Sequence, residues 1–322
     1  EDFSVLGSQD WLDVRYAANG GVPVVAGNIV YTPGTELPEF LDAERNLRTS
    51  NTNWVDVITR NSISTTTDFG YSYANDKWNI FSGLGYAKDE GIIANTFYDR
   101  ATLRLNASVK LFNDRVKIGE NLTVANFREV KANSMEDALL QNPLIPLYAE
   151  DGSFGGPTGA GLQDKWNPLA VLKINKDNIQ KTWRTFGNIY ADVNILDGLT
   201  FSSKFNFDFN RYKFDEQTGA FNQNGSTLGN IFINDGEDFQ RFARNRNETD
   251  VFIFTNLLSF NKDFNEHTVN AFVGHETFNK TQTNDFTRVQ VPFGTNVDFE
   301  NIDQYEIIAD NTILDAYGVG PD

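Results

Sequence analysis

From about residue 62 the chain alternates apolar and polar residues with a period of two, the pattern of β-strands that have one apolar face. Residues 101–112 are the cleanest case, because Ala, Leu and Val occupy the odd positions while Thr, Arg, Asn, Ser and Lys occupy the even positions as far as 110. The same rhythm recurs at 62–74, 76–88, 114–128, 183–195, 199–211, 246–263 and 265–282. We therefore predict about eight strands in an all-β fold.

These predicted strands are long. They run to about 11–18 residues, whereas strands of soluble proteins average about 5–6. A strand that crosses a bilayer needs about 9–11 residues. No run of about 18 consecutive apolar residues occurs, so the sequence predicts no transmembrane helix. The strand lengths favour an antiparallel transmembrane β-barrel segment.

The connections between the strands alternate in length. The short polar ones are 75–77, 112–115, 196–198 and 261–266. The long ones are about 88–98, 129–180, 214–245 and 283 to the end. Short turns at one rim and long loops at the other are typical of bacterial outer-membrane barrels, whose long loops are extracellular.

The residue types on the polar face of the strands distinguish a membrane barrel from a soluble β-sandwich. It carries Arg, Lys, Asn, Asp, Ser and Thr, whose burial in a dry interior would be costly. A wide water-filled lumen tolerates such a face. We expect the following side chains to face that lumen: Arg104, Lys110, Lys204, Asn206 and Asp208.

Residues 1–61 lack this alternation and are expected to form a loop with two short helices. Asp10 is placed to cap a turn that carries Trp11 and Leu12, and Asn53 is placed to cap a turn that begins at Trp54. Prolines and glycines fill the stretch between them, as in a structured loop.

Composition narrows the function further. The formal net charge is −17, with 44 acidic and 27 basic residues, which argues against a nucleic-acid partner. Aromatic residues make up 13% of the chain, which suits a lipid-facing barrel. Cysteine is absent, and no phosphate loop, zinc helix or catalytic motif is evident. We therefore expect no enzyme activity, no cofactor and no metal site.

Several segments resemble the SusC/RagA-type TonB-dependent outer-membrane transporters. They are "TSNTNWVDVITRNS" (49–62), "SGLGYAKDEGIIANTFYDRATLRLNASVKLFNDRVKIGENLTV" (82–124), "NPLIPLYAEDGSFGGP" (142–157), "WNPLAVL" (166–172) and "GNIYADVNILDGLTFSSKFNFD" (187–208). They occur in the family's order and cover roughly residues 49–210. The resemblance implies that the chain is an internal fragment of a 22-stranded barrel, without the plug domain and the remaining strands.

On this reading the chain divides into three parts. Residues 1–61 are an extracellular loop, 62–282 are barrel strands with long loops at 129–180 and 214–245, and 283–322 are a partial extracellular loop. The resemblance further implies a place in the bacterial outer membrane, a SusD-like surface lipoprotein as partner, and energy from the TonB system through the plug. The implied cargo is an oligosaccharide or a peptide.

Four aromatic residues in the predicted long loops are candidates for ligand contact, because their rings can stack on sugars or on peptide side chains. They are Trp54, Tyr148, Phe154 and Trp166. Two alternatives to the transporter fragment remain open on the sequence. One is a self-contained eight-stranded outer-membrane barrel with binding loops. The other is a soluble, secreted, β-rich carbohydrate-active enzyme.

Overall fold

The computed structural model of the chain describes residues 5–26, 29–37, 50–131, 134–148, 154–156, 166–218, 223–224, 239–292, 302 and 318–319. Within these ranges one nine-stranded sheet dominates, with the strand order β13-β12-β11-β9-β8-β6-β5-β4-β3. Neighbouring strands of this sheet are antiparallel throughout. The expected all-β, antiparallel fold is confirmed.

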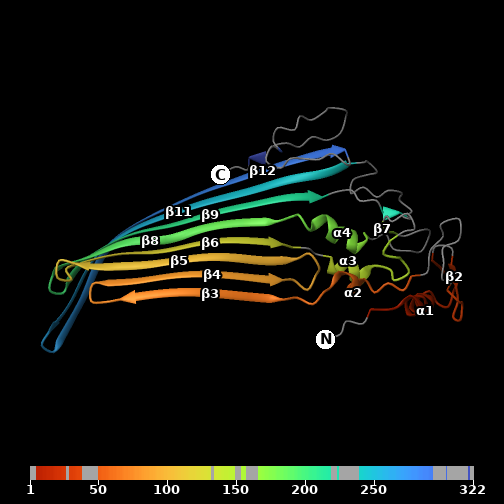
Figure 1. The fold of residues 1–322 in the computed structure, drawn as a ribbon, viewed down its shortest axis with the longest axis horizontal. Helices are drawn as coiled ribbons and strands as arrows, with labels where there is room; N and C mark the ends of the chain where they lie inside the picture. The colour runs from red at the N-terminus through yellow and green to blue at the C-terminus, as the bar shows by residue number, and fades with distance from the viewer. Residues whose placement is uncertain are drawn as a thin grey trace.

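Eight long strands occupy the places of the eight predicted ones. They are β3 (Ser64–Ala74), β4 (Trp78–Glu90), β5 (Phe97–Leu111), β6 (Val116–Val130), β8 (Gln180–Leu196), β9 (Leu199–Thr218), β11 (Phe239–Phe264) and β12 (His267–Pro292). The ninth, β13 (Gly318–Val319), adds two residues beside β12. Consecutive long strands pair with one another, so the sheet is an up-and-down meander (Figure 1).

The tight turns are made by residues that tolerate unusual backbone angles. Asn113 and Asp114 have positive φ between β5 and β6, as does Gly198 between β8 and β9. Between β3 and β4 the Asn75 side chain accepts hydrogen bonds from two backbone N–H groups, those of Lys77 and Trp78. These local bonds close the hairpins and fix the register of the strands.

The bounds of two predicted loops were wrong. The predicted loop 214–245 overlaps strand residues at both ends, because β9 continues to Thr218 and β11 already begins at Phe239. Likewise the predicted final loop, 283–322, begins inside β12, which continues to Pro292. Charged residues interrupt the alternation in these stretches, yet backbone pairing does not depend on alternation. Residues 219–222, 225–238, 293–301, 303–317 and 320–322 lie outside the described ranges.

The helices gather at the end of the sheet opposite the tight turns (Figure 1). They are α1 (Ser8–Ala18), α2 (Trp54–Ile58), α3 (Met135–Leu140) and α4 (Pro168–Asn175). Three short strands accompany them: β1 (Val24–Ala26), β2 (Ile29–Tyr31) and β7 (Phe154–Gly155), the last of which pairs with β10 (Gln223–Asn224). We call this assembly the loop layer. No helix in the described ranges is long and apolar enough to cross a membrane.

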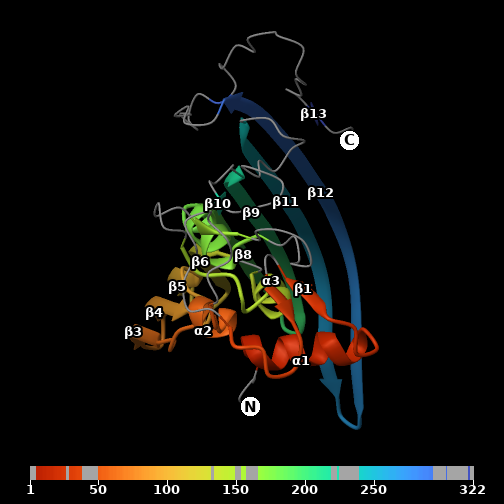
Figure 2. The ribbon, with the colours of Figure 1, turned by 90° about the vertical axis from the view of Figure 1, so that its right-hand side faces the viewer.

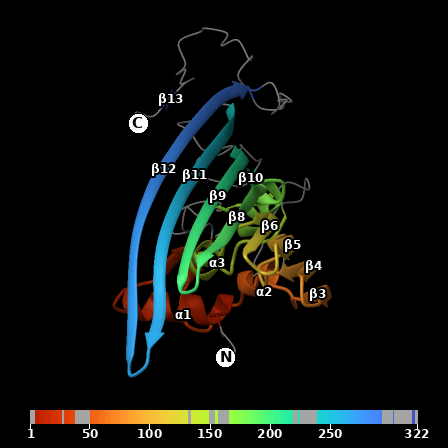
Figure 3. The ribbon, with the colours of Figure 1, turned by 90° about the vertical axis from the view of Figure 1, so that its left-hand side faces the viewer.

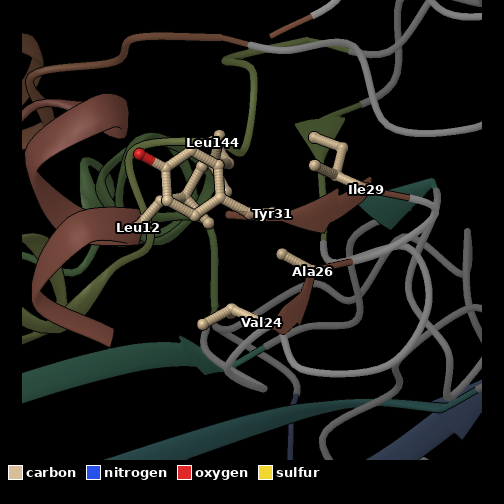
Figure 4. Close-up of a cluster of buried hydrophobic side chains, with 6 residues drawn as sticks. All are labelled: Leu12, Val24, Ala26, Ile29, Tyr31 and Leu144. Atoms are coloured by element: carbon tan, nitrogen blue, oxygen red, sulfur yellow. The ribbon is translucent and has the colours of Figure 1, made fainter. Parts of the chain in front are cut away.

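Two of the three buried clusters lie in the loop layer, and the third lies on β11 and β12 around Phe242 and Val291. Figures 2 and 3 show the sheet as a single curved layer, with no second sheet packed against it. One buried cluster joins α1, the β1–β2 hairpin and Leu144, and the ring of Tyr31 lies beside Leu12 and Leu144 (Figure 4). A second joins α2, α3 and α4 around Trp54, Ile58 and Leu172. A sheet in a soluble protein buries at least one face against another layer. Because this sheet has no such layer among the described residues, its exposed apolar side chains need another environment.

The hairpin of β1 and β2 was not predicted. Each strand has only three residues, flanked by glycine and proline, and such short pairs give no measurable alternation. Helices α1 and α2, by contrast, lie where the sequence placed two helical pieces. The side chain of Asn53 accepts a hydrogen bond from the backbone of Asp56, as an N-cap does.

The sheet does not close on itself within the described residues. There β3 pairs only with β4, and β12 pairs only with β11 and with the two residues of β13. A self-contained eight-stranded barrel would require β3 to pair with β12. The arrangement is that of an arc of a larger sheet, and the closed-barrel alternative is not supported.

Candidate functional site

The register sorts the side chains of the sheet onto two faces. Residues paired directly across an antiparallel ladder lie on the same face. One such row runs from Gly83 through Arg104, Thr123 and Phe186 to Asp208. We call the face that contains this row the polar face, and the opposite one the apolar face.

The five side chains predicted to face the lumen all belong to the polar face. Arg104 and Lys110 lie on it in β5, and Lys204, Asn206 and Asp208 lie on it in β9. The sequence pattern therefore placed them together correctly, although their contact with a lumen remains a prediction. Asp208 is fixed in position, because Arg184 of β8 donates two hydrogen bonds to its carboxylate, of 3.0 and 2.6 Å.

Arg104 borders a hollow of about 390 Å³ on the polar side of strands β3 to β6. Gly83 and Gly85 lie on its floor, beside Arg100 and Asp68. A Cβ at Gly85 would stand 2.6 Å from a carboxylate oxygen of Asp68, so a larger residue there would displace the Asp68 side chain. The lining combines arginine, aspartate and hydroxyl groups, which supply hydrogen bonds suited to a polar solute, with several phenylalanine side chains.

The apolar face presents large hydrophobic side chains to the outside. Phe69 is 68% exposed and Ile189 is 56% exposed. In β9 and β11 the rings of Phe205, Phe207, Phe209 and Phe252 contact one another in stacked, tilted and edge-to-face pairs, with centroids 5.5–6.3 Å apart. A contiguous exposed surface of this kind is not stable against water and indicates contact with lipid or with another protein.

The height of the apolar band fits a membrane. On β4 it lies between Lys77 at the turn and Lys88 near the loop end. Those eleven steps span about 37 Å of strand, and a tilt of about 40° reduces that to roughly 28 Å of depth. A hydrocarbon core is about 30 Å thick. Trp78 and Tyr86 lie just inside the two ends, as interfacial aromatics do.

The loop layer brings together two of the four predicted ligand-contact aromatics. The rings of Tyr148 and Phe154 stack with centroids 5.9 Å apart. The Nζ of Lys173 lies 5.0 Å from both centroids and donates a 2.9 Å hydrogen bond to the Tyr148 hydroxyl. Tyr148 is 42% exposed. We call these three residues the aromatic–lysine cluster.

The other two aromatics are not part of this cluster. Trp54 is buried, with 1% of its surface exposed, and its indole N–H donates to the backbone carbonyl of Asn142. It anchors α2 in the loop layer, so the prediction that its ring contacts a ligand was wrong. Trp166 is half-buried, and its carbonyl accepts a hydrogen bond from the Gln141 side chain.

Two residues that hold the aromatics of this cluster in place, Lys173 and Asn167, were not predicted from the sequence. Asn167 is fully buried and caps α4, since its side-chain oxygen accepts from the backbone N–H groups of Leu169 and Ala170. Its amide also donates to the carbonyls of Leu147 and Gly155. The signal was available in the order Asn167-Pro168, a cap followed by proline in the first helical turn.

No group of three or more His, Cys, Asp or Glu side chains suited to a metal ion occurs in the part of the chain that the structure describes. The polar face and the aromatic–lysine cluster offer hydrogen bonds, ring stacking and charge. Those are the means of binding and guiding a solute.

Comparison with known proteins places the chain beside TonB-dependent receptors. No protein-family model matches it. A TonB-dependent receptor of Formosa agariphila is 25% identical over 231 residues, which cover 68% of this chain and 20% of that protein. The TonB-dependent receptor SusC of Bacteroides thetaiotaomicron is 25% identical over 252 residues, which cover 62% of this chain and 25% of that protein. The chain thus spans about a quarter or less of the length of the curated relatives it matches.

Solved structures give the same assignment of the fold. The RagAB peptide importer in its closed-closed state matches 91% of this chain with a TM-score of 0.66, at 13% identity and over 34% of that chain. The RagAB peptide transporter matches 83% of this chain with a TM-score of 0.61, at 15% identity and over 29% of that chain. The resemblance inferred from the sequence is confirmed, since the chain is similar to a part of a SusC/RagA-type TonB-dependent transporter. These relatives are receptors and transporters rather than enzymes.

Proposed function

We propose that this chain forms part of the wall and vestibule of a SusC/RagA-type TonB-dependent transporter in the bacterial outer membrane. The observation that carries the proposal is the two-faced, single-layer sheet, because one face is apolar and exposed while the other is hollowed and largely polar, although Phe272 and Phe278 of β12 also lie on it. A lipid environment covers the first face and a water-filled lumen the second.

The parts of the chain then have distinct places. Residues 1–61 and the loop layer shape the extracellular vestibule, and strands β3 to β12 line the lumen with their polar face. Within the lumen Arg104, Lys110, Lys204, Asn206 and Asp208 contact water, solute or a plug domain. The tight turns, at the other end of the sheet, face the periplasm (Figure 1).

The partners follow from the family. SusC of Bacteroides thetaiotaomicron is named a TonB-dependent receptor, and RagAB is described as a peptide importer. We propose that the protein works with a SusD-like surface lipoprotein at the loop layer and draws energy from the TonB system. The cargo class is an oligosaccharide or a peptide.

The aromatic–lysine cluster is the proposed contact for that cargo in the vestibule. Stacked rings bind the faces of sugars and the side chains of peptides, and the ammonium of Lys173 adds a hydrogen-bond donor beside them. Asn167 holds both halves of the cluster, since it caps the helix of Lys173 and binds the carbonyl beside Phe154.

Uptake of labelled oligosaccharides and peptides by cells that carry the protein tests this proposal. We expect uptake that stops when TonB is deleted. Replacing both Tyr148 and Phe154 by Ala should weaken cargo binding by about tenfold, or ~1.4 kcal/mol. The matched control is Phe112→Ala, an exposed aromatic in a tight turn at the other end of the sheet. Uptake that does not depend on TonB, or equal effects of both replacements, would contradict the proposal.

A further inference from the structure

A row of charged residues crosses the apolar face just beyond the apolar band, towards the loop layer. In strand order from β4 to β12 it consists of Lys88, Asp99, Arg128, Lys181, Lys213, Arg246 and Asp285. Each member is paired directly with the next across the ladder. Seven adjacent strands therefore carry a charge at the same register position.

The middle of the row is cationic on four neighbouring strands. Arg128 lies opposite Lys181, Lys181 opposite Lys213, and Lys213 opposite Arg246. Like charges placed directly opposite each other destabilise a sheet. The chain as a whole is strongly acidic, with a net charge of −17, so this local excess of positive charge runs against its composition.

Acidic neighbours neutralise only part of this row. Arg128 forms an ion pair of 2.5 Å with Asp99, and Lys213 forms one of 3.2 Å with Asp215. Lys181 and Arg246 form no ion pair within the described residues. They lie two strand spacings apart, about 10 Å at the backbone, so two such long side chains can reach a single anionic group between them.

An apolar groove of about 440 Å³ adjoins the row on the membrane side. Leu103 and Val124 form part of its wall, and Tyr86 and Trp183 stand at its loop end. Trp183 is two residues from Lys181 in the same strand, and therefore on the same face. The groove lies beneath the part of the row on β4 to β8, with aromatics of the interfacial type at the junction. Lys181 lies above its edge at Trp183, and Arg246 lies two strands beyond that edge.

We propose that this face holds a phosphate-bearing lipid, with an acyl chain in the groove and the phosphate on Lys181 and Arg246. The proposal rests on the outer-membrane placement proposed above. A phosphate monoester supplies an anion for the two cations that form no ion pair in the described residues, and an acyl chain fills an apolar groove that water does not stabilise. Free inorganic phosphate would pair with the cations but would leave the apolar groove unfilled, so a lipid fits the whole site better.

Native mass spectrometry of the purified protein in mild detergent tests the proposal with three probes: phosphatidic acid, diacylglycerol with the same acyl chains, and inorganic phosphate. We expect phosphatidic acid to bind more tightly than diacylglycerol. A variant with Lys181→Gln and Arg246→Gln should lose about 25-fold in affinity for phosphatidic acid, or about fivefold for each cation removed. Trp183→Ala should weaken the binding of both lipids.

The matched control carries Lys117→Gln and Lys280→Gln, the same charge change on the polar face. It should bind phosphatidic acid as the wild type does. Equal binding of the two lipids, equal losses in both double variants, or displacement of phosphatidic acid by inorganic phosphate would overturn the lipid site alone. A protein that stays soluble without detergent would overturn the proposed function and the lipid site together.

Discussion

At the scale of single residues, the loop layer is held by polar side chains buried among apolar ones. Tyr31 is fully buried in the cluster around α1; its hydroxyl donates to the carboxylate of Asp13 and accepts from the amide of Gln9. Burial, aided by the neighbouring Asp13, raises the pKa of Tyr31 to about 12. This hydroxyl therefore stays protonated far above the usual range of tyrosine.

The raised pKa makes the stability of the loop layer depend on pH. Because the folded pKa lies above the unfolded value of 10.0, the contribution of Tyr31 is fully present below pH 10 and is lost as the pH rises towards about 12. Tyr31→Phe should remove the tyrosinate absorbance step near pH 12, together with this loss of stability. Tyr71→Phe, at an exposed position of β3, should leave the step in place. A wild-type titration without a step near pH 12 would contradict the burial of this hydroxyl.

Single residues also mark where sequence reasoning fails. Trp54 lies in a predicted loop, and only the packing of α3 and α4 around it shows that its ring is an anchor. Tyr148 and Phe154 were predicted as loop aromatics, but their contact with each other and with Lys173 was not. That contact depends on a loop conformation that no periodic pattern encodes. Contacts between irregular segments depend on tertiary packing, which alternation and capping signals do not report.

At the scale of elements, the strands follow directly from the alternation of residue types. The residues 101–112 predict β5 within a few positions, because one apolar and one polar face dictate a period of two. Their ends were less accurate. Strands β11 and β12 each have 26 residues and extend far past the apolar band, where charged side chains break the pattern but the ladder continues.

Neighbouring positions on β5 provide a test of the two faces. Leu105 lies in the middle of the apolar face and Asn106 on the polar face. Leu105→Arg should lower the free energy of unfolding in lipid vesicles by about 2–4 kcal/mol, because an arginine then faces the bilayer interior. Asn106→Arg should change it by less than about 1 kcal/mol, since that side chain faces water. Denaturant titration of both variants measures the difference, and similar losses would mean that the faces are assigned wrongly.

At the scale of the whole molecule, the sheet is an open arc whose stability depends on its surroundings. Two of its buried clusters lie in the loop layer and a third lies on β11 and β12, and no second sheet of the described chain covers either broad face. An exposed apolar face and an unpaired strand such as β3 both favour aggregation in water. A bilayer would cover the exposed apolar face, and further strands would pair with the edge strands.

The central claim is that the apolar face of this sheet contacts lipid and the polar face contacts water. Since the chain has no cysteine, single cysteines placed along β5 report on each position without background. The measurement is their reaction with a water-soluble thiol reagent in outer membranes. We predict labelling at 102, 104, 106 and 108, and protection at 101, 103, 105 and 107. Uniform labelling along the strand, or labelling of the odd positions alone, would contradict the account.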